Sequence, residues 1–248
     1  MTLPHIFLPA KDLQGEEVIL EGEKAFYLLD VLRLRKGERL FLMDGEGAYF
    51  LAELISASRG KAFLKIIGKE WKERKPPFLI SAIPLLKGDR TETSIRALSQ
   101  IGISAFLPFI SERTVVKLDE KKKRQREARW QKQAIEEAEL SRSPFYPEVK
   151  RIRNFKDVLE ELEDIPILIA YERAEEMAGT NLFNVPEKVA LITGPEGGFS
   201  EREISLARGK GAKLISLGEN IISAEFAPLV LATLVLFSYR FDIPLRVS

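Results

Sequence analysis

The amino-acid sequence predicts a two-domain α/β protein, in which a small β-barrel-like domain precedes a larger domain built on a parallel sheet. The first part of the chain contains short segments of strand composition, and the second part alternates strands with helices. Between them lies a charged stretch that ends in two prolines, residues 69–77. Because proline cannot continue a central strand, we expect this stretch to be a linker. The predicted domains are therefore residues 1–72 and 73–248.

The first domain is predicted to consist of short strands and one helix. Segments rich in β-branched and aromatic residues indicate the strands, and Asp44-Gly45 and Arg59-Gly60 are turn signals between them. The strands are expected at residues 18–20, 39–43, 48–55 and 61–67. The helix is expected at residues 22–32, with Phe26, Leu29 and Leu32 as the apolar stripe that faces the core.

The second domain shows the alternation of strands and helices that is typical of a parallel sheet covered on both faces. Strands are expected at residues 78–83, 104–108, 165–171, 189–193 and 213–217, and helices at residues 91–101, 119–139, 154–162, 200–208 and 224–239. Gly102 is placed to end the first of these helices. Ser200 with Glu203 fits a capping box that begins the fourth.

The composition excludes several classes of protein. The 248 residues contain no cysteine, so neither a disulfide scaffold nor a thiolate metal site can form. A single histidine, His5, leaves little for a metal site or a Ser-His-Asp triad, and no metal is expected. The N-terminus lacks a signal-peptide pattern and no apolar run is long enough to span a bilayer, so we expect a cytoplasmic protein. The net charge of +1 does not indicate a nucleic-acid partner, and that question depends on local patches.

A glycine-rich loop after a buried strand is the first candidate for a ligand site. Its sequence is Thr193-Gly-Pro-Glu-Gly-Gly-Phe-Ser200. Glycines permit backbone conformations that are closed to other residues and let a ligand approach closely. In parallel sheets, ligands bind beyond the carboxyl ends of the strands, so this loop could hold a nucleotide-like ligand. On spacing alone, a simple strand-to-helix turn is an equally good interpretation; a P-loop is excluded because no Gly-Lys-Ser/Thr follows.

A second loop has the same placement, between a strand and the final helix. Its sequence is Leu217-Gly-Glu-Asn-Ile-Ile-Ser-Ala-Glu-Phe-Ala-Pro228. Two such loops in succession could form two walls of one pocket. Glu225 lies near the predicted helix N-terminus, where a carboxylate interacts favourably with the helix dipole. It is therefore either a polar group of the pocket or only a first-turn acid.

Basic residues indicate possible RNA contacts at three places. Arg90 and Arg113 follow strand ends, although single surface arginines are more often solvated than functional. A basic run at residues 117–129 has few aromatic neighbours; it is by default a solvated helix face, with an RNA backbone contact as the alternative. The first domain carries a further basic cluster, made of Arg33, Arg35, Lys36 and Arg39. Such a cluster suits phosphate contacts that position RNA without reading its sequence.

At these residues the chain resembles the RsmE family, bacterial methyltransferases of the SPOUT superfamily that modify N3 of a uridine in 16S ribosomal RNA. The matching stretches run over almost the whole chain with the family's order and spacing. They are Val31-Leu-Arg-Leu-Arg-Lys-Gly-Glu38, Lys87-Gly-Asp-Arg90, Ile110-Ser-Glu-Arg-Thr-Val-Val-Lys117, Ala138-Glu139 with Ser141-Arg142, the loop from Thr193 to Ser200, and Leu217-Gly218 followed by Ile221 and residues 225–228. Each motif alone is modest, but together they are specific.

The resemblance implies a fold, a cofactor and a partner. The first domain would be a PUA-like barrel that binds RNA, and the second a SPOUT fold with a C-terminal trefoil knot, an exception to the rule that chains avoid knots. S-adenosylmethionine would bind between the two loops and the end of strand 165–171. The residues that would bind it are Ala170, Tyr171, Thr193, Gly194, Glu196, Gly197, Gly198, Leu217, Gly218, Ile221, Ile222, Ser223 and Ala227. The enzyme would be a homodimer that acts on 16S rRNA within the small ribosomal subunit.

The resemblance also places the chemistry at uridine N3, which must lose its proton. Arginines would position the RNA, and a carboxylate could be a polar partner or accept the proton. The candidates are Arg90, Arg113, Arg142, Glu139 and Glu225. The chain departs from the family pattern after Ile222, where Ser223 and Phe226 stand in place of the usual arginine and threonine. A methyltransferase with another RNA target, or a non-catalytic RNA-binding assembly factor, therefore remains an alternative.

Overall fold

The computed structural model describes residues 3–174 and 185–241, which form two compact units. Residues 3–74 and Ala138–Tyr146 make up the N-terminal unit. The C-terminal unit contains Lys75–Glu137 and the described residues from Pro147 onward. The chain therefore passes between the units three times. Sequence patterns indicate one boundary near residue 73 and give no sign that residues 138–146 group with the first unit.

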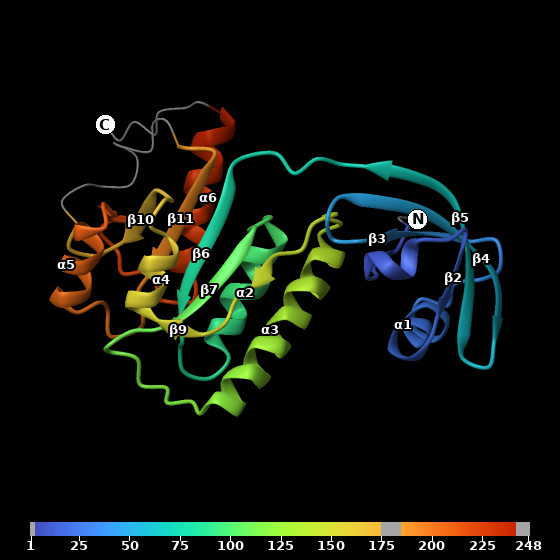
Figure 1. The fold of residues 1–248 in the computed structure, drawn as a ribbon, viewed down its shortest axis with the longest axis horizontal. Helices are drawn as coiled ribbons and strands as arrows, with labels where there is room; N and C mark the ends of the chain where they lie inside the picture. Colours follow the sequence, from blue (N-terminus) through green and yellow to red (C-terminus); the bar gives the residue numbers. More distant parts are fainter. Residues whose placement is uncertain (1–2, 175–184, 242–248) are drawn as a thin grey trace. The chain divides into compact units, whose positions relative to one another are not determined.

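The N-terminal unit is a curled five-stranded sheet (Figure 1). Its strands are β1 (His5–Phe7), β2 (Glu17–Leu20), β3 (Arg39–Met43), β4 (Ala48–Ser58) and β5 (Lys61–Trp71). They lie in the order β1-β3-β4-β5-β2, with β1 parallel to β3 and the other neighbours antiparallel. The predicted strands are confirmed, and β5 extends into the predicted linker. Strand β1 was not expected, because three residues are too few for a clear alternating pattern.

The predicted apolar stripe of the first helix is correct at Leu29, which packs against the core, and wrong at Phe26 and Leu32. Helix α1 (Gly22–Phe26) continues as a π-helical turn, η2 (Tyr27–Val31), and a 3-10 turn, η1 (Ala10–Leu13), precedes β2. Ala25 and Leu28 are fully buried, whereas Phe26 is 60% exposed and Leu32 38% exposed. Ala25 and Leu28 are spaced as on one side of a helix, and Phe26, Leu29 and Leu32 have the same spacing shifted by one residue. Helical periodicity alone therefore does not decide which of these two sets of side chains points toward the core.

Residues 138–146 cover the outer face of this sheet, opposite the core formed by residues such as Leu40 and Leu42. The backbone N–H of Phe7 donates to Glu139 Oε1 at 2.7 Å, and the Phe7 ring meets the edge of the Tyr146 ring with centroids 5.1 Å apart. The Tyr49 hydroxyl donates to the carbonyl oxygen of Arg142 at 2.7 Å. These contacts explain why the last residues of a long helix, Glu120–Leu140, and the segment after it belong to the N-terminal unit.

The C-terminal unit is a parallel sheet with helices on both faces, as the sequence predicts (Figure 1). Its strands are β6 (Phe78–Pro84), β7 (Ala105–Ile110), β8 (Glu148–Val149), β9 (Arg153–Asn154), β10 (Ile167–Ala170), β11 (Lys188–Thr193) and β12 (Lys213–Ile215). They lie in the order β12-β10-β11-β6-β7-β8, with β9 also paired to β7, and every pairing is parallel. Strands β8 and β9 have two residues each and were not expected from the sequence.

Helices cover this sheet over two hydrophobic cores. The helices are α2 (Arg90–Gln100), α3 (Glu120–Leu140), α4 (Phe155–Glu161), α5 (Glu201–Gly209) and α6 (Ala227–Phe241). Helices α2, α3 and α6 cover the core that contains Trp130, and α4 and α5 cover the other. None of the helices that the structure describes is long and apolar enough to cross a membrane.

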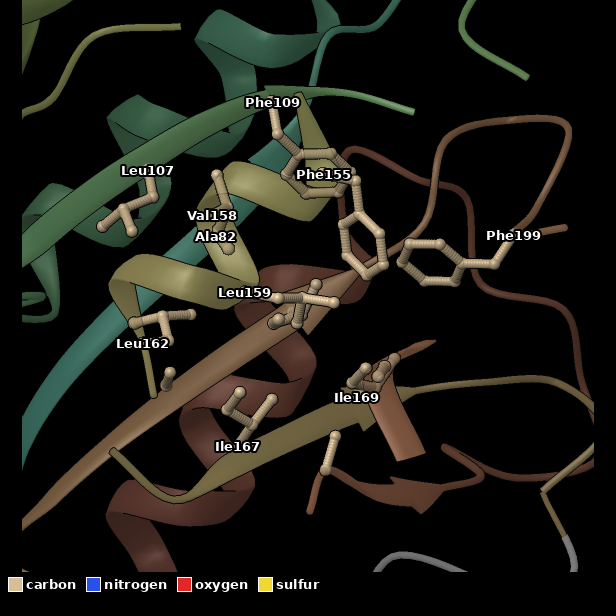
Figure 2. Close-up of a cluster of buried hydrophobic side chains, with 14 of the residues drawn as sticks. Ala82, Leu107, Phe109, Phe155, Val158, Leu159, Leu162, Ile167, Ile169 and Phe199 are labelled. Carbon is tan, nitrogen blue, oxygen red and sulfur yellow. The ribbon is translucent and has the colours of Figure 1, made fainter. Parts of the chain in front are cut away.

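The second of these cores holds the glycine-rich loop in place. Phe199, at the end of the loop, lies beside Phe155, with ring centroids 5.1 Å apart, and Phe155 in turn packs on Phe109 at 5.2 Å (Figure 2). All three rings are almost fully buried. The loop after β11 is thus anchored in the core through an aromatic cluster.

Candidate functional site

A cavity of about 580 Å³ lies at the carboxyl ends of the parallel strands of the C-terminal unit. The end of β10, the loop between β11 and α5, and the loop between β12 and α6 form its walls, and Arg90 at the start of α2 completes it. Parallel α/β sheets bind ligands at this edge, and small-molecule sites commonly have this volume. The position and size of the cavity therefore favour a ligand site.

The structure brings the predicted cofactor-binding residues together. Except for Gly197, each of them lines the cavity. Gly197 instead lies against Arg113, whose Cβ would be 3.3 Å from a Cβ added at this glycine. The lining also includes residues that the sequence did not single out: Glu172, Pro195, Phe199, Ser216, Glu219, Asn220 and Ala224. Most of these could have been inferred as neighbours within the two loops, whereas no motif marks Glu172 or Ser216.

Backbone conformation shapes the walls of this cavity. Gly198 has φ +66° and Gly218 has φ +125°, which residues with a side chain rarely adopt. At Gly194, a Cβ would come within 3.1 Å of the Phe199 ring, so glycine lets that ring fold under the loop. At these three glycines the two loops present main-chain groups to the cavity.

Hydrogen bonds to the first turn of α5 hold residues 111–113 beside the glycine-rich loop. The predicted capping box is confirmed: Ser200 Oγ accepts from the Glu203 N–H at 3.1 Å, and Glu203 Oε2 accepts from the Ser200 N–H at 2.9 Å. The buried Glu203 carboxylate also accepts from the Glu112 N–H at 2.9 Å and the Ser111 hydroxyl at 3.1 Å. This brings Arg113 to the loop, where its Nη1 donates to the Gly197 carbonyl oxygen at 2.9 Å.

Arg90 lies between two carboxylates at the cavity. Its Nη1 is 3.8 Å from Glu196 Oε1, and its Nε is 3.9 Å from Glu225 Oε1. The Ser94 hydroxyl donates to the Glu225 carbonyl oxygen at 2.9 Å and so holds the start of the final helix against α2. Three of the predicted site residues are thus brought within reach of one another.

Two buried polar atoms at this site have no hydrogen-bond partner within the part of the chain that the structure describes. They are Thr193 Oγ1, at the end of β11, and Glu225 Oε2. A buried polar group without a partner costs about 1–3 kcal/mol. Because Thr193 lines the cavity, a polar ligand that reaches its buried hydroxyl would supply the missing partner.

Two other candidates, Glu139 and Arg142, belong to the N-terminal unit. Burial lowers the pKa of Lys24, and the charges of Glu139 and Asp12 oppose that effect. Arg142 has φ +57° and lines a cavity of that unit. Their roles in catalysis stay predictions.

The basic residues lie mostly on the surface. Every member of the cluster in the N-terminal unit is open to solvent: Arg33, Arg35, Lys36 and Arg39. In the basic run on α3, Lys122, Lys123 and Arg129 form ion pairs with nearby acids. This pairing favours a solvated helix face for the run.

Two family models match the chain. A model described as the RNA methyltransferase domain matches residues 73–236, and one described as the RNA methyltransferase PUA domain matches residues 20–67. Two similar curated proteins are both named ribosomal RNA small subunit methyltransferase E. The one from Synechocystis sp. is 36% identical over 218 residues, covering 86% of this chain and 70% of the relative. The one from Bacillus subtilis is 30% identical over 223 residues, covering 85% and 86%.

Solved structures resemble the whole fold. Ribosomal RNA small subunit methyltransferase E from Neisseria gonorrhoeae, bound to S-adenosyl methionine, matches with a TM-score of 0.83 and 28% identity over 97% of this chain and 98% of that one. A methyltransferase from Legionella pneumophila, also in complex with this cofactor, matches with a TM-score of 0.85 and 26% identity over 96% and 98%.

Proposed function

The chain belongs to the RNA methyltransferase family whose members include ribosomal RNA small subunit methyltransferase E, and from this premise we propose that it methylates N3 of a uridine in 16S ribosomal RNA with S-adenosylmethionine as the methyl donor. The observation that carries the proposal is the cavity of the C-terminal unit. The residues that the resemblance assigns to the cofactor come from three separate segments, and apart from Gly197 they line this one cavity.

The chemistry of the cavity fits S-adenosylmethionine. Its adenine and ribose need donors and acceptors at close range, which the exposed backbone of glycine loops supplies. The Thr193 hydroxyl, buried and without a partner among the described residues, offers one more polar contact. Apolar lining from Leu217, Ile222 and Ala227 suits the face of a purine ring, and the carboxylate of Glu172 suits the positive charge of the amino or sulfonium group.

The residues of the chain would mainly position the RNA. When bound, S-adenosylmethionine supplies a methyl group on a positively charged sulfur for in-line displacement, so the placement of the uridine matters more than covalent help. N3–H of uridine is a weak acid, and a cation beside the base stabilises the anion that forms when the proton leaves. Arg90, held between Glu196 and Glu225, is suited to this role. Glu225 Oε2 can orient the base or accept its proton.

Four further properties belong to the same proposal. The PUA-like unit, with its exposed Arg33 and Arg35, contacts the RNA backbone. The enzyme acts in the cytoplasm on the small ribosomal subunit. The protein is a homodimer, which the exposed apolar side chains of Ile221 and Phe226 support. The chain forms a trefoil knot near its C-terminus. The knot is supported by the chain path, since β12 lies beyond β10 and α6 then returns to pack on β11 and β6.

The proposal is tested with small ribosomal subunits that lack the modification. We expect incubation with the protein and labelled S-adenosylmethionine to place the label on N3 of one uridine of the 16S RNA. Label on a ribose or on another base would refute uridine N3 as the target, although the protein would still be a methyltransferase. Titration calorimetry with the cofactor provides the second readout: a folded protein that releases no heat would refute the enzyme as a whole.

A further inference from the structure

A second cavity, of about 470 Å³, lies within the N-terminal unit. It is lined by Leu3, His5, Phe41, Tyr49, Glu70, Lys72 and Arg142. Most of these residues lie on strands, on the sheet face opposite the core that contains Leu40 and Leu42. The cavity is separate from the basic cluster of Arg33, Arg35, Lys36 and Arg39, to which the sequence assigned RNA contacts.

Strand register builds the aromatic wall of this cavity. His5 on β1 pairs with Phe41 on β3, and Tyr49 on β4 pairs with Glu70 on β5. Because side chains that are in register share one face of a sheet, the rings come together. The His5 and Phe41 ring centroids are 5.1 Å apart, and the Tyr49 ring stands edge-on to both, at 6.1 Å from His5 and 5.7 Å from Phe41. The hydrogen bond from the Tyr49 hydroxyl to the Arg142 carbonyl oxygen fixes the third ring.

Two cations stand at the rim of the same cavity. Lys72 Nζ lies 4.6 Å from the centroid of the Tyr49 ring, and both Lys72 and Arg142 are exposed. Burial is the main cause that lowers the pKa of His5; the charges of Arg142 and Lys72 add to it, and the hydrogen bond with the Leu3 carbonyl oxygen opposes it. The imidazole is therefore neutral at pH 7 and presents an aromatic face, not a third charge.

We propose that this cavity binds an unstacked base of single-stranded RNA, with the base on the half-buried rings of His5 and Phe41 and the adjoining phosphates on Lys72 and Arg142. Proteins recognise single-stranded RNA by stacking bases on aromatic faces while cations follow the backbone, and this cavity has both. Glu70 can only accept hydrogen bonds, so it suits the N–H groups of a base edge and disfavours a phosphate on its side. The inference rests on the proposed function, since the RNA substrate supplies the base.

Fluorescence anisotropy with two labelled probes tests the proposal. One probe is a uridine decamer, and the other is a decamer of the same charge whose riboses lack bases. We expect Phe41→Leu, which keeps an apolar side chain but removes the ring, to weaken binding of the uridine decamer at least about fivefold and to leave the abasic decamer unchanged. Phe26→Leu, at an exposed aromatic residue of α1, is the matched control and should change neither.

The rim is tested by Arg142→Gln, at an exposed residue of the cavity. We expect it to weaken both probes and to reduce the slope of log K against log salt by about 0.7, the value for one phosphate contact on a single strand. Arg59→Gln is the control, because Arg59 also has a positive φ, of 50°, and lies in the β4–β5 turn. Unchanged binding in both Phe41→Leu and Arg142→Gln, with both variants folded, overturns the proposal, and so does equal weakening of the two probes by Phe41→Leu.

Calorimetry with S-adenosylmethionine on the same proteins separates this proposal from the function on which it rests. A wild-type protein that binds the cofactor but does not distinguish the uridine decamer from the abasic decamer overturns the base site alone. A wild-type protein that prefers the uridine decamer but binds no cofactor overturns the methyltransferase assignment and keeps the base site.

Discussion

The two cavities described above are built from different parts of the polypeptide. In the C-terminal unit, the wall includes backbone in conformations that only glycine readily adopts, at Gly198 and Gly218. In the N-terminal unit, the wall consists of side chains that strand register places side by side, such as His5 and Phe41. A backbone wall is specified by local φ and ψ angles and tolerates few substitutions. A side-chain wall can change residue by residue while the sheet beneath it stays the same.

The largest effect is expected where the backbone wall is anchored. Glu203→Ala removes the acceptor for the buried Ser111 hydroxyl and for the part-buried backbone N–H groups of Glu112 and Ser200. We expect the free energy of unfolding of the C-terminal unit to fall by about 3 kcal/mol, measured by denaturant titration. Glu201→Ala, on the same helix turn but exposed and paired with Arg173, should cost at most about 1 kcal/mol. An equal loss of unfolding free energy in the two variants would mean that the hydrogen bonds to Glu203 do not stabilise the loop more than an exposed ion pair does.

The next largest effect tests the glycine conformation itself. Gly198→Val places a β-branched residue at φ +66°, which costs about 2 kcal/mol or forces the loop to change. We expect the affinity for S-adenosylmethionine to fall roughly 30-fold, measured by calorimetry. Gly209→Val is the control, because this helix residue has open space around it and an ordinary φ. Unaltered affinity in Gly198→Val would show that the cavity does not depend on a left-handed backbone.

A smaller effect, of opposite sign in two measurements, is expected at Thr193. Its buried hydroxyl has no partner among the described residues, so Thr193→Val should raise the free energy of unfolding without cofactor by about 1 kcal/mol. The same change should weaken cofactor binding about fivefold, because the bound ligand loses a hydrogen bond. Thr91→Val is the matched control: the Thr91 hydroxyl accepts from the Leu86 N–H at 2.8 Å, so its loss should destabilise the protein. A destabilised Thr193→Val would contradict this account.

The smallest effect concerns the side-chain wall. Burial lowers the pKa of His5 below its ordinary value of 6.5, so the folded protein disfavours the protonated ring. This contribution to stability is complete above the unfolded-state pKa and is lost as the pH falls through the lower, folded-state pKa. We expect His5→Gln to reduce the loss of stability between about pH 7 and about pH 5, measured by denaturant titration. If the wild type and the variant lose the same amount of stability over this pH range, His5 does not contribute to the pH dependence.

The sequence predicted the parallel sheet and the cavity of the C-terminal unit well, because both depend on local signals. Apolar segments of strand and helix length alternate there, and glycine loops follow two of the strands. The strands β8 and β9 were not predicted, because each has only two residues and two residues show no periodicity. The predicted stripe of the first helix was wrong at Phe26 and Leu32, because Ala25 and Phe26 begin equally regular apolar series.

The cavity of the N-terminal unit could not be predicted in this way. His5, Phe41 and Tyr49 are far apart in the sequence or lie on different strands, and only the pairing of β1, β3 and β4 assembles them. Arg142 joins them from a segment that follows α3, through a hydrogen bond of its backbone. Such a site depends on register and on long-range packing, which no motif of neighbouring residues records.

The placement of residues 138–146 has a consequence for how the two units have been inherited. These residues interrupt the C-terminal unit in the sequence, yet Glu139 and Tyr146 complete the N-terminal one. If a recombination event exchanged residues 3–74 alone, residues 138–146 would still have the side chains that fit the original sheet, and they would pack poorly on the new one. The two units are therefore expected to have diverged as a pair, with substitutions on the sheet matched by substitutions in the distant segment, and not to have been shuffled as independent modules.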